Sequence, residues 1–211
     1  MHFLDLIKED GLILDIGANI GIMTVHLAQR FPNSTILSFE PVPTNITCLK
    51  RVVNRFGLKN VMIIETALGD KSGELEMIMP VWGNVKKQGL SHVVGADNIS
   101  QNDINPNEKG LHYKVPVTTI DQFLEKEFPS QKIVAIKIDV ENFEYPVFLG
   151  AQKTVSDYHP IIYSELWENE NRSNCFSLMK SLSYKIMILS NDKLILFDEK
   201  IHKTQNFFFM N

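Results

Sequence analysis

Residues 12–21 read LILDIGANIG, and the fold that we expect for the chain is argued from this stretch. Leu12–Ile16 is an apolar run interrupted by one acid, which is typical of a buried strand. Gly17 and Gly21 then end the strand, and apolar residues at helical spacing follow over 20–30. A strand that turns over glycines into a helix predicts the start of a β-α-β unit.

The alternation of short apolar runs with amphipathic stretches continues along the chain. It predicts further strands at 35–40, 61–65, 75–79, 115–118, 133–139 and 160–166, and helices at 44–56, 120–128, 146–155 and 172–182. Because β-α-β crossovers are right-handed, the expected fold is α/β, a doubly wound, mostly parallel, Rossmann-like sheet with helices on both faces. Closely spaced runs at 184–189, 194–197 and 207–209 predict a C-terminal antiparallel hairpin or meander.

Two local features refine this pattern. Thr44 or Asn45 is expected to cap the helix at 44–56, and Gly57 is expected to end it, as glycine after a helix commonly does. The strand at 115–118 follows a long break in the pattern, so we expect it at an edge of the sheet.

The chain has 211 residues, which suits one domain better than two. Neither a repeat nor a linker composition divides it, so residues 1–211 are predicted to form a single domain. Residues 82–112 are rich in Gly, Asn, Asp, Ser and Lys and show little periodicity. A stretch of this kind predicts an irregular segment that is either a functional loop or lid or disordered.

Composition excludes several other classes of protein. The net charge is −4 and the Lys and Arg residues are scattered, which argues against nucleic-acid binding. The two cysteines, Cys48 and Cys175, have no CxxC or CxxH spacing, so neither a disulfide framework nor a zinc site is expected. The chain shows no signal-peptide pattern and no apolar run of about 20 residues, so we expect a cytoplasmic protein without a membrane span.

The turn after the first strand carries the first chemical signal. It reads Asp15-x-Gly17-x-Asn19-x-Gly21, whereas a dinucleotide site would read G-x-G-x-x-G. A carboxylate at this place would oppose a pyrophosphate but would attract a sulfonium cation and an amine. The turn, including Ala18, is therefore predicted to bind S-adenosylmethionine. The alternative is a plain strand-to-helix turn in which Asp15 caps the helix.

Glu40 closes the second strand about twenty residues beyond the glycines. A carboxylate in this place accepts hydrogen bonds from both hydroxyls of an adenosine ribose. Pro41 follows it and restrains the loop, so we assign both residues to the cofactor. The alternative for Glu40 is an exposed acid at a strand end.

Two further groups of residues belong to the same predicted site. Ala67 and Leu68 follow the third strand and are small or apolar, which suits a slot for a flat adenine ring; the alternative is that they only lead into a turn at 69–73. Asp139 ends the fourth strand at the ligand-binding rim and is predicted to position the methionine amine or the acceptor. Lys137 and Glu141 alternate with it and are expected to reach the same rim; the alternative is an ion pair of Lys137 with a neighbouring acid.

At this point the chain resembles the FkbM-type methyltransferases. The matching runs are LILDIGANIGIMTVHLA from residue 12, SFEP at 38–41, ALGDKSGELE at 67–76, VPVTTIDQFL at 115–124, IKIDVENFEYPVFLGA at 136–151 and IIYSELWE at 161–168. The resemblance implies a class I methyltransferase fold with S-adenosylmethionine as methyl donor. It also implies O-methylation of a hydroxyl on a sugar, glycan or secondary metabolite.

Residue by residue, the resemblance assigns a set of positions to the cofactor and Asp139 to the rim of the fourth strand. The cofactor set is Asp15, Gly17, Asn19, Gly21 and Glu40. Asn142 departs from the family, which usually has glycine after D-V-E at this place. Asparagine tolerates positive φ better than most residues, so the turn can survive. Many relatives also have helices before the first strand, and here only residues 3–8 take that position.

A hydroxyl acceptor must lose a proton, so a base is expected near it. The candidates are Asp139, Glu141, Glu165 and His92. His92 lies in the irregular segment, where a lone histidine is often exposed without a catalytic role, and the alternative for Glu165 is that it caps the following turn. No metal is predicted, because nothing in the spacing of these acids requires one.

Two other functions remain open from the sequence. A nucleotide-cofactor oxidoreductase of the NAD type uses the same doubly wound plan, and the G-x-N-x-G spacing is the feature that argues against it. A non-catalytic protein that binds S-adenosylmethionine is the second alternative, and Asn142 and the short segment before the first strand are the two features compatible with it.

Overall fold

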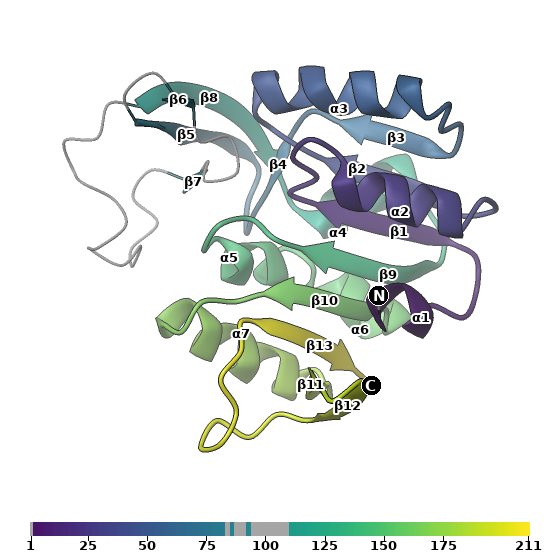
Figure 1. The fold of residues 1–211 in the computed structure, drawn as a ribbon, viewed down its shortest axis with the longest axis vertical. Coiled ribbons are helices and arrows are strands. Elements are labelled where there is room, and N and C mark those ends of the chain that lie inside the picture. The colour runs from purple at the N-terminus through teal and green to yellow at the C-terminus, as the bar shows by residue number, and fades with distance from the viewer. Residues whose placement is uncertain (1, 83–84, 87–91, 94–109) are drawn as a thin grey trace.

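The computed structural model describes residues 2–82, 85–86, 92–93 and 110–211, and these form two sheets (Figure 1). The strands of the larger sheet are β1 (Leu12–Ile16), β2 (Thr35–Phe39), β3 (Val61–Ile64), β9 (Ile133–Ile138), β10 (Ile161–Glu165), β11 (Lys185–Ser190), β12 (Lys193–Leu196) and β13 (Asn206–Met210). They lie in the order β12-β11-β13-β10-β9-β1-β2-β3.

The larger sheet is parallel from β3 to β10 and becomes antiparallel at its C-terminal side. β1 pairs in parallel with β2 and β9, and β9 pairs in parallel with β10. β13 inserts between β10 and β11 and runs antiparallel to both, and β12 forms an antiparallel hairpin with β11. The prediction of a doubly wound, mostly parallel sheet that ends in antiparallel strands is confirmed.

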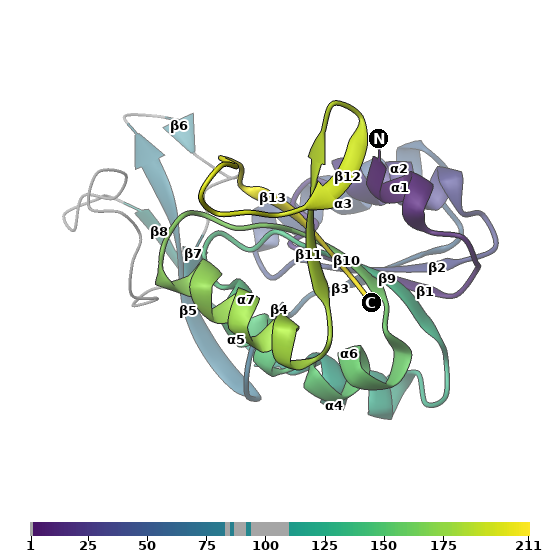
Figure 2. The same ribbon diagram turned by 90° about the horizontal axis from the view of Figure 1, so that it is seen from below.

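Seven helices accompany these strands in the described residues. They are α1 (His2–Leu6), α2 (Ile22–Arg30), α3 (Pro43–Arg55), α4 (Ile120–Glu127), α5 (Glu144–Leu149), α6 (Gln152–Tyr158) and α7 (Glu170–Ser181). Figure 2 shows α1 and α2 on one face of the larger sheet and α4, α5, α6 and α7 on the other.

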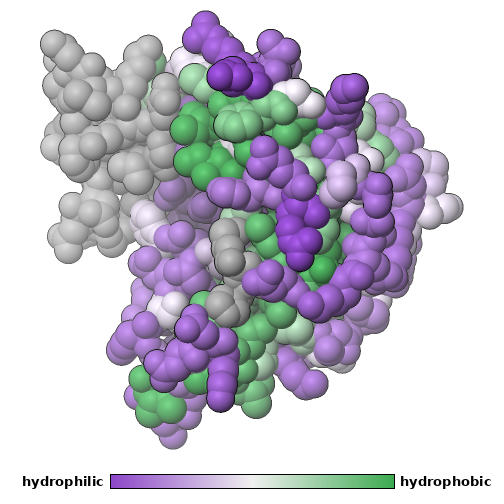
Figure 3. Space-filling model, turned by 45° about the vertical axis from the view of Figure 1, so that its right-hand side comes forward, coloured by the Kyte–Doolittle hydropathy of each residue, from purple (hydrophilic) through white to green (hydrophobic). Residues whose placement is uncertain are grey.

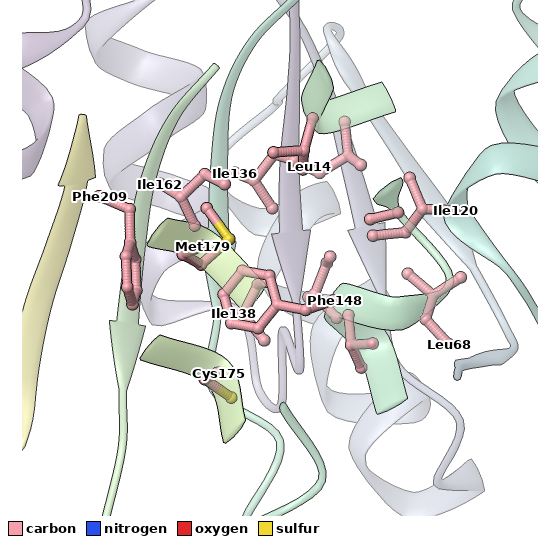
Figure 4. Packing of buried hydrophobic residues seen from close by; sticks show 14 of the residues in the cluster. Leu14, Leu68, Ile120, Ile136, Ile138, Phe148, Ile162, Cys175, Met179 and Phe209 are labelled. Carbon is pink, nitrogen blue, oxygen red and sulfur yellow. The ribbon is translucent and has the colours of Figure 1, made fainter. Parts of the chain in front are cut away.

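Alternation along the strands supplies an apolar layer for each face. Leu14, Ile136 and Ile162 come from neighbouring strands and pack against Phe148 of α5 and Met179 of α7 (Figure 4). The intervening strand residues, such as Ile13 of β1, pack on the other face with α1 and α2. Burial on both faces explains why the β1 run is almost wholly apolar.

A second, smaller sheet was not predicted. It contains β4 (Ala67–Leu68), β5 (Gly73–Trp82), β6 (Val85–Lys86), β7 (His92–Val93) and β8 (Gly110–Thr118). β8 pairs with β4 on one side and β5 on the other, so the prediction that 115–118 is an edge strand is wrong. The pairing of β5 with β8 joins segments far apart in the chain, and periodicity within one segment does not report such pairing.

The segment 82–112, predicted to be irregular, overlaps this sheet. It contains β6, β7 and the start of β8, so the prediction is wrong at these residues. The rest of the predicted loop, at 83–84, 87–91 and 94–109, lies outside the described residues.

Three local expectations can be compared with the structure. The helix α3 begins at Pro43 after Val42, without a side-chain cap, so the prediction of Thr44 or Asn45 as cap is wrong. Proline at the first helical position already has helical φ and lacks the N–H that a cap would satisfy. Gly57 follows the helix with φ of +61°, as expected. The helix predicted at 146–155 is two helices, α5 and α6, interrupted at Gly150.

The face of the molecule shown in Figure 3 is mainly hydrophilic, and hydrophobic residues form separate patches on it. In the part of the chain that the structure describes, no helix combines the length and the apolar character needed to cross a membrane.

Candidate active site

A cavity of about 430 Å³ lies at the carboxyl ends of the parallel strands. In doubly wound sheets this edge is where ligands bind, and the volume falls in the usual range for small-molecule sites. Its walls come from the segments that follow β1, β2 and β9, together with β4 and parts of β5 and β7. The two sheets therefore both contribute to one cavity.

The glycine turn after β1 forms one wall, and its backbone explains the residues found there. Gly17, Asn19 and Gly21 have φ of +72°, +50° and +92°. A Cβ on Gly17 would lie 1.9 Å from the carbonyl oxygen of Asp139, so only glycine lets this turn touch the one after β9. Ala18, between Gly17 and Asn19 in the chain, also lines the cavity.

Glu40 follows β2 and is buried in the adjoining wall. Its Oε2 accepts a hydrogen bond from the Asn19 amide at 2.8 Å, and its Oε1 accepts from the Val42 amide at 2.9 Å and from Asn45 Nδ2 at 3.2 Å. Burial raises the pKa of the Glu40 carboxyl, and these hydrogen bonds oppose the shift. The carboxylate thus holds the glycine turn and the loop at Pro41 together while it faces the cavity.

Asp15 is fully buried and lies behind the cavity wall. Its Oδ2 accepts a hydrogen bond from Thr24 Oγ1 at 2.6 Å, and its Oδ1 lies 3.6 Å from Lys137 Nζ. The structure shows it supporting the turn, and a direct contact with the cofactor stays a prediction.

Lys137 was expected at the ligand-binding rim, with an ion pair as the alternative, and the structure shows it lining the cavity. It is 6% exposed, and its Nζ donates hydrogen bonds to the carbonyl oxygens of Ile16 at 3.2 Å and Gly17 at 2.9 Å. The same Nζ lies 3.6 Å from carboxylate oxygens of both Asp15 and Asp139. Sheet register brings these groups together, because Lys137 stands directly opposite Asp15 across the β1–β9 pair.

Two of the four expected bases line the cavity. Asp139 and Glu141 both reach it, and the Asp139 side chain is 41% exposed. Burial, followed by the neighbouring carboxylates of Asp139, Glu144 and Glu165, raises the pKa of Glu141 to about 8. Glu165 does not line the cavity, and burial with the nearby Asp139 raises the pKa of its carboxyl.

His92 is placed away from the cavity wall. It lies on β7 opposite Ile78, is 5% exposed, and is not part of the lining, whereas its neighbour Val93 is. Consecutive residues of a strand point to opposite faces, so β7 turns one of this pair toward the cavity and the other away from it.

The far end of the cavity is mainly apolar. Ala67 and Leu68 line it as expected, together with Val42, Met77 and Phe143. The sequence pattern missed these last three, because Met77 belongs to the second sheet and Phe143 reaches the cavity from the start of α5. An apolar slot of this kind suits a flat ring.

The cavity also offers polar atoms that lack partners. In the described residues, Asn19 Oδ1 and Asn45 Oδ1 are buried without a hydrogen-bond partner, and both side chains line the cavity. Buried polar atoms are normally satisfied, so these oxygens indicate where a ligand donates hydrogen bonds. A nucleoside with ribose hydroxyls and an amine fits this donor requirement, and S-adenosylmethionine carries both.

No group of three or more His, Cys, Asp or Glu side chains in the described residues is arranged to hold a metal ion. Tyr163 and His26 are two further cavity residues that the sequence did not single out. Tyr163 Oη donates a hydrogen bond to Asn206 Oδ1 at 2.5 Å, and burial raises the pKa of its hydroxyl to about 12.

A doubly wound sheet with a glycine turn, an acid after the second strand and an apolar slot defines the class I S-adenosylmethionine-dependent methyltransferases. The protein is of this class, and S-adenosylmethionine is its cofactor. The model of the methyltransferase FkbM domain matches residues 15–186, and the chain belongs to that family. This membership sets aside the NAD-type oxidoreductase considered from the sequence.

Individual relatives agree with this assignment. The chain is 24% identical over 189 residues to Methyltransferase 1 of Beauveria bassiana, covering 85% of this chain and 74% of the relative. The crystal structure of methyltransferase FkbM from Methylobacillus flagellatus has a TM-score of 0.60 at 14% identity, over 97% of this chain and 45% of that one. A Streptococcus mutans methyltransferase structure in complex with SAH has a TM-score of 0.54 at 11% identity, over 99% of this chain and 91% of that one.

The chain thus spans less than half the length of the Methylobacillus flagellatus protein. At these identities the structural likeness concerns the fold, and the acceptor has to be argued from the cavity itself.

Proposed function

We propose that the protein transfers a methyl group from S-adenosylmethionine to a hydroxyl of a sugar, glycan or secondary metabolite. The observation that carries this proposal is the pair of carboxylates, Asp139 and Glu141, in the wall of the cavity at the end of β9. A hydroxyl must lose its proton as it is methylated, and a carboxylate beside it can accept that proton.

The other end of the cavity supports the proposed binding of the donor. Glu40 faces the cavity, and its Oε2, which accepts one hydrogen bond, retains a lone pair for a ribose hydroxyl. Ala67 and Leu68 with their apolar neighbours suit the adenine ring. Asp139, held 3.6 Å from Lys137, is proposed to orient the amine of the donor or the acceptor.

Bound S-adenosylmethionine supplies a methyl group already activated by a positively charged sulfur. The residues of the chain then have three tasks, which are to align donor and acceptor, to exclude water and to take up a proton. Lys137 keeps the glycine turn and the end of β9 in fixed positions through its bonds to Ile16 and Gly17. Of the four candidate bases, Asp139 and Glu141 are favoured, because Glu165 and His92 do not line the cavity.

Calorimetry tests the donor side. We expect S-adenosylhomocysteine to bind and NAD to show no heat of binding at the same concentration. Binding of NAD without any response to S-adenosylhomocysteine would contradict the proposed use of the cavity.

An acceptor panel tests the reaction. Release of S-adenosylhomocysteine is followed with monosaccharides, oligosaccharides, phenols, aliphatic alcohols and amines, and the methylated atom of the product is identified by NMR. Methylation of oxygen supports the proposal, whereas methylation of nitrogen or carbon in a turned-over acceptor would overturn it.

A further inference from the structure

The turn that carries Glu141 has an unusual backbone. Glu141 and Asn142 have φ of +53° and +70°, so two consecutive residues other than glycine adopt the left-handed region. This region is disfavoured for a side chain such as glutamate. Backbone strain of this kind persists only where the surroundings enforce it, and it gathers at functional sites.

The surroundings that enforce this turn come from the start of α7. Asn169 Nδ2 donates a hydrogen bond to Asn142 Oδ1 at 2.7 Å, and Asn171 Nδ2 donates to Glu144 Oε2 at 2.7 Å. The other oxygen of Glu144 accepts from the amides of Val140 and Asn142, each at 3.2 Å. The turn is thus fixed from both sides, by its own helix and by a neighbouring one.

The fixed turn places Glu141 in the cavity wall with charges around it that favour proton uptake. Asp139, Glu144 and Glu165 surround it with like charge, and Lys137 is the cation that opposes them. Asp139 is paired with Lys137 at 3.6 Å, whereas Glu141 forms no ion pair within the described part of the chain. With burial, this environment raises the pKa of Glu141 to about 8, close to the value that suits a base at neutral pH.

We propose that Glu141 is the general base that takes the proton of the acceptor hydroxyl, and that Asn142, through Asn169, is the residue that positions it. This inference rests on the proposed O-methylation. As the acceptor oxygen forms its bond to the methyl carbon, the carbon–sulfur bond breaks with its electron pair going to sulfur, and the hydroxyl proton passes to the Glu141 carboxylate. Asn142 touches neither reactant and acts only through the backbone of the turn.

Two ligands test Glu141 without any knowledge of the acceptor. Sinefungin carries a charged amine where S-adenosylmethionine carries its methyl group, and S-adenosylhomocysteine has no group there. A carboxylate facing the transferred methyl group should bind sinefungin more tightly, by about tenfold at pH 8, the effect of a hydrogen bond to a charged group. The preference should grow between pH 6 and 8, because the ionised fraction of Glu141 rises as the pH approaches its pKa of about 8.

The Glu141→Gln variant removes the charge and keeps the shape of the side chain. We expect it to lose most of the preference for sinefungin while its affinity for S-adenosylhomocysteine stays within about twofold, a change well below that of a lost charged hydrogen bond. Glu170→Gln is the matched control, because Glu170 is an exposed acid at the start of α7. Thermal melting shows whether each variant is folded.

The Asn142→Gly variant tests the positioning role. Glycine adopts the positive φ of this turn without strain, so the substitution removes the bond to Asn169 and leaves the backbone allowed. We expect the preference for sinefungin and its pH dependence to weaken, with the affinity for S-adenosylhomocysteine unchanged. If the variant keeps the preference for sinefungin and its pH dependence, the role of Asn142 is overturned and that of Glu141 is not.

The outcomes separate this inference from the proposal on which it rests. Failure of the wild-type protein to bind S-adenosylhomocysteine contradicts the proposed donor site itself. Normal binding with the same sinefungin preference in Glu141→Gln as in the wild type shows that Glu141 is not the base. Equal losses of the sinefungin preference in Glu141→Gln and Glu170→Gln would also overturn the inference. The preference would then come from the general attraction of the protein's acids for a cation.

Discussion

Glu40 and Glu141 are both acids in the wall of one cavity, but they are held in different ways. Glu40 accepts three hydrogen bonds, from the amides of Asn19 and Val42 and from Asn45. Glu141 has carboxylates around it, and these with burial raise its pKa to about 8. A carboxylate held by donors is suited to a fixed binding contact, whereas one surrounded by like charge is suited to proton uptake.

Lys137 lies where the half of the cavity that contains Glu40 meets the half that contains Asp139 and Glu141. Its removal should have the largest effect on stability. Lys137→Met leaves Asp15 as a fully buried carboxylate without its cation. We expect the free energy of unfolding to fall by about 3–5 kcal/mol, as for other broken buried pairs. Denaturant unfolding measures this change.

The double variant Asp15→Asn with Lys137→Met is the control for this prediction. It removes both charges and should recover a large part of the loss. A loss below about 1 kcal/mol in the single variant would show that the buried pair does not hold the two halves together.

Gly17 tests the close contact between the two turns. Gly17→Ala introduces a Cβ 1.9 Å from the Asp139 carbonyl oxygen at a residue with φ of +72°. We expect a loss of about 2–4 kcal/mol in unfolding free energy, together with weaker binding of S-adenosylhomocysteine. Gly57→Ala is the matched comparison, because its φ is +61° and no atom lies within 4 Å of the new Cβ. Equal losses in the two variants would mean that the clash with Asp139 is unimportant.

Glu40 tests the binding half alone. Glu40→Ala should weaken binding of S-adenosylhomocysteine by about 1–3 kcal/mol, the range for losing hydrogen bonds to a charged group. Calorimetry on the folded variant measures the effect, and Glu65→Ala is a control because that acid follows β3 at the surface, paired with Lys50. Unchanged affinity in Glu40→Ala would refute the assignment of Glu40 to the ribose.

The carboxyls around Glu141 predict that stability depends on pH. The pKa of Glu141 is raised from 4.5 to about 8, and that of Glu144 to about 7, so the folded state binds these protons more tightly than the unfolded state. The two carboxyls therefore make their full contribution to the free energy of unfolding below pH 4.5, and this contribution is lost as the pH rises toward 8.

Glu141→Gln should flatten this dependence. Because Glu141 is partly solvated, we expect the variant to gain only about 1 kcal/mol at pH 8, or about 2–4 °C in Tm. Melting curves between pH 5 and 9 measure the slope. A wild-type Tm that rises over this range, or a variant with the same slope, would contradict the electrostatic description of this half.

The same contrast explains how much could be predicted from the sequence. The glycine turn and Glu40 are set by residues adjacent to their strands, so the order of strand, turn and acid was sufficient to predict where they lie. The positive φ of Asn142 was also predictable, because asparagine is among the residues that tolerate it.

What could not be predicted depends on pairing between distant segments. The second sheet joins β5 to β8, and it alone brings Met77 to the cavity. The contact of Lys137 with Asp15 requires the register of β1 against β9, which alternation within either strand does not reveal. The hydrogen bond from Asn169 to Asn142 likewise joins residues 27 positions apart.

A crystal structure of the protein with S-adenosylhomocysteine is the most direct test of the account. We predict that a ribose hydroxyl donates a hydrogen bond to Glu40, that its adenine lies beside Ala67 and Leu68, and that its sulfur faces Asp139 and Glu141. Binding outside this cavity, or with the ribose away from Glu40 and the sulfur away from the two acids, would contradict the division of the cavity into a donor half and a proton-accepting half.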